Sequence, residues 1–244
     1  MPAAHLIKQV DERNLPDLRP EIDRKKPVGD QVYKALKGAI VSMAIPPRTS
    51  ISENNVCDVT GVSRTPVRRA IARLEDEGMI DVYPQRGTFV APIDLEKVFN
   101  GHFIRRAVEV EVVRKAAPLW NEMWDERARR LLRSQQECID NNRPDALQEF
   151  QKIDEQFHRT IAQCAGVEGV WELARDLKDQ LDRVRYLAVP GVGHMEAVIA
   201  EHEALLRKLK ANDEAGAVEA ITAHLDTIYD TIERLRDESP EFFI

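Results

Sequence analysis

Apolar positions recur at helical intervals over most of the chain. Val32, Leu36 and Ile40 follow a 3.6-residue period that predicts a helix between residues 28 and 42. Beyond residue 93 the same period continues, interrupted by prolines, glycines and the Asn212-Asp213 pair. These breaks predict helices over residues 94–117, 124–142, 145–165, 168–189, 194–211 and 213–237. The fold is therefore expected to be mostly α, ending in an all-α bundle of about six helices.

The stretch from Ser52 through Glu75 has the pattern of two short helices joined by a tight turn. Ser52 is a suitable N-cap for the first helix, and Gly61 suits the left-handed turn that ends it. Ser63 is a suitable N-cap for the second helix, and Pro66 lies in its first turn, where a missing N–H costs little. The pattern predicts a helix-turn-helix whose second helix enters the DNA major groove.

Three arginines, Arg64, Arg68 and Arg69, gather at the start of that second helix. A helix N-terminus already attracts anions, so cations at this end do not stabilise the helix. They are well placed to contact phosphates and guanine edges. The alternative interpretation is a small helical domain with a surface cluster of arginines.

A short hairpin follows the second helix. Residues 81–83 and 88–91 read as strands, and the turn between them carries Arg86 and Gly87 at its tip. Glycine allows close approach to the sugar-phosphate backbone, and the arginine reaches for a phosphate or the minor groove. A hairpin in this position is the wing of a winged helix-turn-helix.

The composition divides the chain into four parts. We expect a flexible N-terminal arm at 1–28, a winged helix-turn-helix domain at 29–92, an all-helical domain at 93–238 and a C-terminal tail at 239–244. The arm is polar and interrupted by prolines, and its Arg24-Lys25-Lys26 run either touches DNA or is simply solvated.

The net charge of −7 argues by itself against a nucleic-acid partner. The excess of acidic residues, however, lies in the second part of the chain. Residues 21–92 carry 11 Lys/Arg and 9 Asp/Glu, whereas residues 93–244 carry 21 Lys/Arg and 30 Asp/Glu. The first part therefore has a balance suited to DNA, particularly in a dimer. Three scattered cysteines, the lack of an apolar signal core and the lack of a membrane-spanning run predict a cytoplasmic protein.

A second group of candidate functional residues lies in the predicted helical domain. Asp154 and His158 are an i,i+4 pair on one helix face, and His202 and His224 lie at similar distances on either side of the Asn212-Asp213 turn. One carboxylate and three imidazoles then converge, a ligand set that suits Zn²⁺, Ni²⁺, Mn²⁺, Co²⁺ or Fe²⁺. The alternatives are a surface ion pair, or hydrogen bonds within the core. Trp120, Trp171, Tyr186 and Met195 are candidates to line a nearby pocket, although such residues more often pack in a core.

Together these residues resemble the GntR family of bacterial transcription regulators, in the group with an FCD effector domain. The first part of the resemblance is the run Gly61–Arg68 with the wing residues Arg86–Val90. The second is the Asp154-x-x-Phe157-His158 motif, followed by His202 and His224.

The resemblance implies a homodimeric repressor or activator that binds a palindromic operator in double-stranded DNA. It implies that Arg64 and Arg68 contact bases and phosphates and that Ser63 and Thr65 contact the backbone. It also implies metal ligation by the motif of one aspartate and three histidines. The effector of the family is a small carboxylic acid that completes the coordination of the metal, and Arg105 is the residue placed to neutralise it.

Two positions depart from the family pattern: Arg69 stands where members usually have Glu, and Asn54 where some relatives have a DNA-contacting Arg. A metal-dependent enzyme acting on a small organic acid is the competing hypothesis, because an open Asp/His₃ site can activate water. The chain lacks HExxH, and the arginine-rich helix would then have no purpose, so we do not expect an enzyme. A metal-independent regulator is the third hypothesis.

Overall fold

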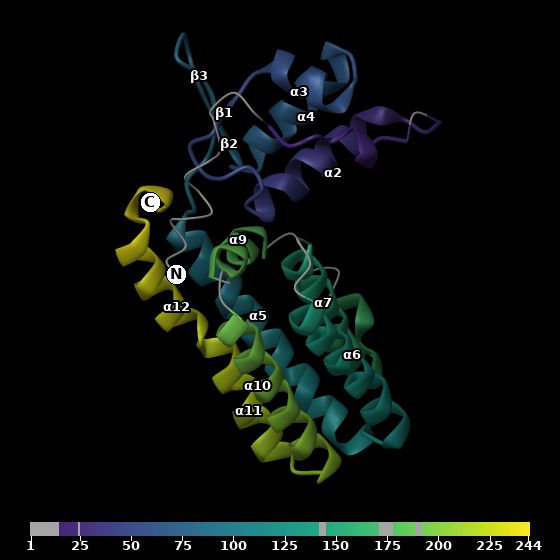
Figure 1. Cartoon of the computed structure of the whole chain (residues 1–244). Coiled ribbons are helices and arrows are strands. Elements are labelled where there is room, and N and C mark those ends of the chain that lie inside the picture. The colour runs from purple at the N-terminus through teal and green to yellow at the C-terminus, as the bar shows by residue number, and fades with distance from the viewer. Residues whose placement is uncertain (1–14, 24, 142–144, 171–177, 189–191) are drawn as a thin grey trace. The chain divides into compact units, whose positions relative to one another are not determined.

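The computed structural model describes residues 15–23, 25–141, 145–170, 178–188 and 192–244. Figure 1 shows that helices dominate and that a single small sheet lies in the N-terminal part. Chain contacts define two compact units, which we describe separately. The first contains the described residues up to Leu95 with Asp182–Leu187 and Leu235–Ile244, and the second contains Glu96–Leu181 and Ala188–Arg234.

The first unit is a winged helix-turn-helix, which confirms the sequence prediction. Its elements are η1 (Arg19–Glu21), α2 (Val28–Val41), β1 (Ser50–Ile51), α3 (Glu53–Thr60), α4 (Arg64–Asp76), β2 (Ile80–Tyr83) and β3 (Gly87–Val90). The strands form an antiparallel sheet in the order β1-β3-β2, with Ser50 opposite Phe89 and Tyr83 opposite Gly87. The sequence pattern missed β1 because a strand of two residues has no period to detect.

Local chemistry fixes the turn between α3 and α4. The Ser52 side chain accepts a hydrogen bond from the backbone N–H of Asn55, and Gly61 ends α3 with a φ of 66°. Behind this turn, Leu36, Val67 and Leu74 are fully buried in one core that α2, α3 and α4 share. The core therefore holds α4 by one face and leaves its other face to solvent.

Part of the expected flexible arm belongs to this core. Leu15 and Leu18 are buried, and the backbone N–H of Leu18 donates to the carbonyl of Val59 at 2.9 Å. Two leucines in a polar, proline-rich segment are enough to dock it, which average composition does not reveal. Residues 1–14 and Arg24 lie outside the described residues.

The segment after β3 is held from two sides. Arg183, on α9 (Asp179–Ala188), is fully buried and donates to the carbonyls of Ala91 at 2.6 Å and Pro92 at 3.3 Å. Burial lowers the pKa of Arg183 to about 10, so the guanidinium keeps its charge at neutral pH. The expected C-terminal tail contains η4 (Pro240–Phe242), and Ile93 pairs with Phe243 as a parallel bridge. These residues therefore pack as part of the first unit.

The second unit is all-helical, as predicted. Its helices are α5 (Leu95–Ala116), η2 (Ala117–Leu119), α6 (Glu122–Asn141), α7 (Ala146–Cys164), α10 (Val192–Lys210), α11 (Glu214–Asp226) and α12 (Ile228–Glu238), with parts of α5, α9 and α12 belonging to the first unit. Their apolar faces meet around Leu132, Phe157 and Leu206. Within the described residues, no helix has the length and apolar character needed to cross a bilayer.

Two expected helices are broken. The predicted helix at 213–237 is interrupted at Thr227, whose hydroxyl donates to the carbonyl of His224 at 2.7 Å and thus offers the backbone an alternative partner. The predicted helix at 168–189 is helical at 168–170 and again from Asp179, with a bend at Lys178, and residues 171–177 lie outside the described residues.

Leu74→Ala tests whether this core holds α4 in place. Truncating a fully buried leucine removes transfer free energy and leaves a cavity, so we expect the free energy of unfolding to fall by about 2–5 kcal/mol. Chemical denaturation followed by circular dichroism measures the change. Glu75→Ala, an exposed neighbour on the same helix, is the control and is expected to shift the midpoint little. Equal loss in the two variants would contradict the assignment of the core.

Candidate functional site

The start of α4 presents polar side chains to solvent. Ser63 is the N-cap residue by backbone conformation, yet its side chain makes no capping hydrogen bond, and the first turn holds no acidic residue. Ser63, Arg64, Thr65 and Arg69 are all exposed. The expected capping role of the Ser63 side chain is thus wrong, and its hydroxyl remains on the surface beside the arginines.

Arg68 is held by a residue that sequence reasoning missed. Its Nε donates to Oε1 of Glu53 at 2.8 Å and its Nη2 donates to Oε2 at 3.0 Å, a two-pronged contact across the helix-turn-helix. The hydrogen bond from Arg68 lowers the pKa of Glu53, so the carboxylate stays ionised. Because Glu53 opens α3 and lies 15 residues before Arg68, only the known geometry of the motif would have indicated this pair.

The wing carries Arg86 on a tight turn. Gln85 has a φ of 64°, Gly87 has a φ of 117°, and the backbone N–H of Arg86 donates to the carbonyl of Tyr83 at 3.0 Å. A Cβ at position 87 would also lie 3.4 Å from the ring of Phe89. Glycine at this position therefore sets the shape of the turn, and Arg86 is exposed beside it.

Three histidines of the second unit come together in its interior. His158 of α7, His202 of α10 and His224 of α11 each offer a ligand atom, and these atoms lie within 4.8 Å of one another. The carboxylate of Asp154 joins them, with Oδ1 3.6 Å from Nε2 of His202 and Oδ2 3.8 Å from Nε2 of His158. All four side chains are buried, so the structure brings together the four residues predicted as metal ligands.

Two glutamates behind the histidines orient the rings. Nδ1 of His158 lies 2.6 Å from Oε2 of Glu109, and Nδ1 of His224 lies 2.6 Å from Oε2 of Glu201. A carboxylate at this distance favours the tautomer that carries its proton on Nδ1. In that tautomer Nε2 of each ring keeps its lone pair and can ligate a metal. Sequence reasoning missed both glutamates, although Glu201 is the chain neighbour of His202.

Arg105 contacts both Glu109 and His158. Its Nε donates to Oε1 of Glu109 at 2.5 Å, and its Nη2 lies 3.4 Å from Nε2 of His158. Burial alone would raise the pKa of Glu109, but Arg105 and then His158 hold it well below its usual range. Burial lowers the pKa of His158, so its ring is neutral at neutral pH. The arrangement is an ionised carboxylate shared between a guanidinium and a neutral imidazole.

The donor set fits a divalent transition metal. Ligand atoms about 2.0–2.2 Å from one ion lie about 3–4 Å apart, and the Asp154 contacts of 3.6 and 3.8 Å are in that range. Neutral imidazoles and one carboxylate are borderline-to-hard donors, and carboxylate partners on ligating histidines are a regular feature of metal sites. The chemistry of the residues is therefore that of a metal centre.

A further histidine of the second unit, which had no predicted role, pairs with an aspartate. His102 is buried, its Nε2 is 3.1 Å from Asp226, and its ring meets the edge of Tyr229. Trp120 packs against the apolar core of the second unit, and Trp171 lies outside the described residues.

Two family models match the chain. The family described as bacterial regulatory proteins, gntR family, matches residues 28–90, and the FCD domain matches residues 102–227. The HTH-type transcriptional repressor RspR of Escherichia coli (strain K12) is 33% identical over 91% of this chain and 96% of its own length. An HTH-type transcriptional regulator of Streptomyces ambofaciens is 32% identical over 87% and 88%.

Solved structures show the same fold. E. coli McbR/YncC aligns with a TM-score of 0.68 at 19% identity, over 86% of this chain and 99% of that one. A putative GntR regulator from Rhodococcus sp. RHA1 also aligns with a TM-score of 0.68, at 20% identity, over 84% and 97%. The relatives are transcription regulators, so the competing hypothesis of an enzyme is not supported.

His202→Ala tests the metal centre. Wild-type protein is expected to retain about one equivalent of divalent metal per chain after desalting, and His202→Ala less than a tenth of that, because removing a ligand typically costs metal affinity tenfold or more. Elemental analysis by plasma mass spectrometry measures the content. His194→Ala is the control: it lies eight residues earlier on α10, about 12 Å along the axis. Metal-free wild type, or full metal in His202→Ala, would refute the site.

Glu53→Gln tests the carboxylate that holds Arg68. Removing a negative charge near DNA is expected to tighten non-specific binding by up to about fivefold at low salt, since a unit charge at contact distance is worth ~1 kcal/mol in water. Loss of the two-pronged contact also frees the Arg68 rotamer, so the ratio of specific to non-specific affinity is expected to fall. Fluorescence anisotropy at fixed salt measures both affinities.

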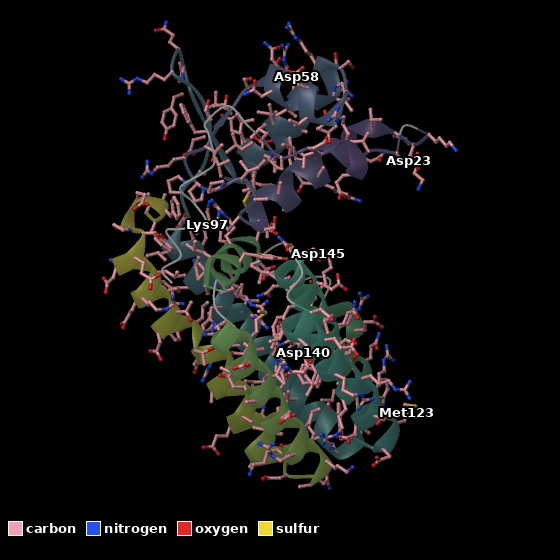
Figure 2. The ribbon with its side chains drawn as sticks, viewed as in Figure 1. Asp23, Asp58, Lys97, Met123, Asp140 and Asp145 are labelled. Carbon is pink, nitrogen blue, oxygen red and sulfur yellow. The ribbon has the colours of Figure 1, made fainter. Side chains whose placement is uncertain are left out.

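Asp58→Asn makes the same charge change at an exposed residue of α3, labelled in Figure 2, and leaves the Glu53–Arg68 pair in place. It is expected to tighten non-specific binding and to retain the specificity ratio. If both variants behaved alike, Glu53 would act only through its charge.

Proposed function

We propose that a small carboxylic acid controls the affinity of this protein for operator DNA. The chain belongs to the GntR family of bacterial transcription regulators and is a DNA-binding regulator with an FCD domain. The acid would bind at a divalent metal held by Asp154, His158, His202 and His224. The observation that carries the proposal is the buried convergence of these four ligands, with the guanidinium of Arg105 beside them.

The DNA contacts are proposed for the start of α4 and the wing. Arg64 and Arg68 would reach base edges and phosphates in the major groove, and the exposed hydroxyls of Ser63 and Thr65 would bind the backbone. Arg69 adds a further cation to this surface, and Arg86 and Gly87 extend it along the wing. Phosphate contacts position the helix, whereas arginine contacts to guanine determine sequence preference.

A homodimer is proposed because one recognition helix covers only a half-site. Two copies related by a two-fold axis bind a palindrome whose half-sites are about 34 Å apart, one turn of B-DNA. The second copy doubles the phosphate contacts of a chain whose overall charge is −7.

The effector contacts follow from the charges around the cluster. Four protein ligands leave room at a divalent ion for an acid oxygen, and the ion supplies an electrostatic anchor for that carboxylate. In the structure Nη2 of Arg105 lies near Nε2 of His158, and the lone pair of that Nε2 would ligate the ion. When that lone pair is engaged, the Nη2 donor of Arg105 is available to the incoming carboxylate, while its Nε stays on Glu109.

The proposed control is thermodynamic linkage between the acid and the operator. An acid that changes operator affinity must bind the two states of the protein differently, and couplings of 1–3 kcal/mol correspond to changes of about 5–150-fold. The proposal takes the protein as a repressor released by the acid, with Zn²⁺, Ni²⁺, Mn²⁺, Co²⁺ or Fe²⁺ as the ion.

Arg64→Ala tests the DNA-binding surface. Loss of an arginine that contacts guanine is expected to cost about 1–3 kcal/mol of specific binding, roughly 5–150-fold in affinity, and to leave metal content unchanged. An operator is first selected from random duplexes with wild-type protein, and anisotropy titration then compares the variants.

Arg130→Ala is the control, because Arg130 is an exposed arginine of the second unit that pairs with Glu126. It is expected to bind the selected operator as wild type does. Undiminished binding by Arg64→Ala would exclude this residue from the recognition surface.

A further inference from the structure

Gln135 is a buried amide that no part of the fold accounts for. It continues the inward stripe of α6 formed by Ala128 and Leu132, and its side chain is fully buried. Among the described residues neither its Oε1 nor its Nε2 has a hydrogen-bond partner. An amide buried in this way costs free energy unless something satisfies it, so its presence points to a ligand.

The packing of α6 on α7 places Gln135 close to the level of Asp154. Ser134 and Cys138 of α6 line one groove with Ile153 and Glu149 of α7, an antiparallel register in which residue 135 lies opposite residues 151–153. Asp154 is then only a few residues away along the axis, about 2–5 Å at 1.5 Å per residue.

The packing of α6 on α10 gives an independent estimate. Nζ of Lys210 lies 3.2 Å from Glu122 and 3.4 Å from Asp125, and Glu203, earlier in α10, interacts electrostatically with Arg129, later in α6. The two helices are therefore antiparallel. His202, eight residues before Lys210, is level with residues 130–133 of α6. Gln135 therefore lies within about one and a half turns of His202 as well as within one turn of Asp154.

We propose that Gln135 is a second polar contact of the effector site and that the effector is a hydroxy-carboxylic acid. This inference rests on the proposed function, in which the carboxylate is taken at the metal and Arg105. A hydroxyl farther along the same molecule donates to Oε1 of Gln135 and accepts from Nε2, which satisfies both amide atoms. An unsubstituted carbon chain would leave both atoms without partners.

The probes are two pairs of acids matched in length: glycerate with propanoate, and gluconate with hexanoate. Protein reconstituted with Zn²⁺ is titrated with each acid by calorimetry. We expect at least one hydroxylated acid to bind about tenfold or more tightly than its unsubstituted partner, because a site built to hydrogen-bond a hydroxyl strongly rejects the analogue that lacks it. Equal affinity within both pairs, or preference for the unsubstituted acids, overturns the proposal.

Gln135→Met keeps the length of the side chain and removes both polar atoms. It is expected to retain metal and unsubstituted-acid binding and to lose most of the discrimination, to within about threefold. Gln136→Met is the matched control, since Gln136 is exposed on the same helix and bonds Asp140 at 2.9 Å. It is expected to discriminate as wild type does. Unchanged discrimination in Gln135→Met overturns the assignment.

Stability separates a ligand contact from a structural amide. Without acid, Gln135→Met is expected to raise the thermal midpoint by about 2–4 °C, because it removes a buried amide that has no partner. An amide that an internal water satisfies would give a lower midpoint on substitution, and that result overturns the proposal.

The outcomes also separate this inference from the proposed function. If acids bind and change operator affinity but neither hydroxyl groups nor Gln135 matter, only the inference fails. If none of the four acids binds the metal-loaded protein, both fail for these acids.

Discussion

The central interaction of the second unit is the carboxylate of Glu109 between Arg105 and His158. It is almost completely buried, and an ion in that position is stable only because two partners share its charge. The same carboxylate fixes the ring of His158, and through that ring the direction of the ligand lone pair. Removing it would leave a mostly buried guanidinium without its carboxylate partner and free the ring, so the geometry of the histidine cluster and the position of Arg105 depend on one residue.

The DNA-binding unit is organised in the opposite way. Its apolar core holds α4 by one face, and its functional groups stand in solvent, where charges contribute little to stability. The Glu53–Arg68 pair is the exception, because its two-pronged geometry limits the rotamers of an exposed arginine. Stability therefore comes from burial, whereas the cations proposed to recognise DNA are exposed, so Leu74 and Arg64 can be changed with separable effects.

Periodicity and capping residues were sufficient to predict the helix-turn-helix, the wing and the helical second part. The four residues from Asp154 to His224 could be brought together because one pair shares a helix face and the other flanks a turn at matched distances. What the sequence could not indicate depends on contacts across the fold. Leu15 and Leu18 dock without a local pattern, and Glu109 and Glu201 are ordinary helix carboxylates until histidines are packed behind them. Gln135 can be recognised as a candidate contact only when the burial of its side chain and its hydrogen-bond partners are both known.

The most direct test of the account is reciprocity between the two sites. Operator affinity is measured in Zn²⁺-loaded protein with and without saturating gluconate, and gluconate affinity is measured with and without operator, at one salt concentration. The account predicts that each ligand weakens the other by the same factor, within the range of about 5–150-fold. Gluconate that binds at the metal while operator affinity stays unchanged would contradict it.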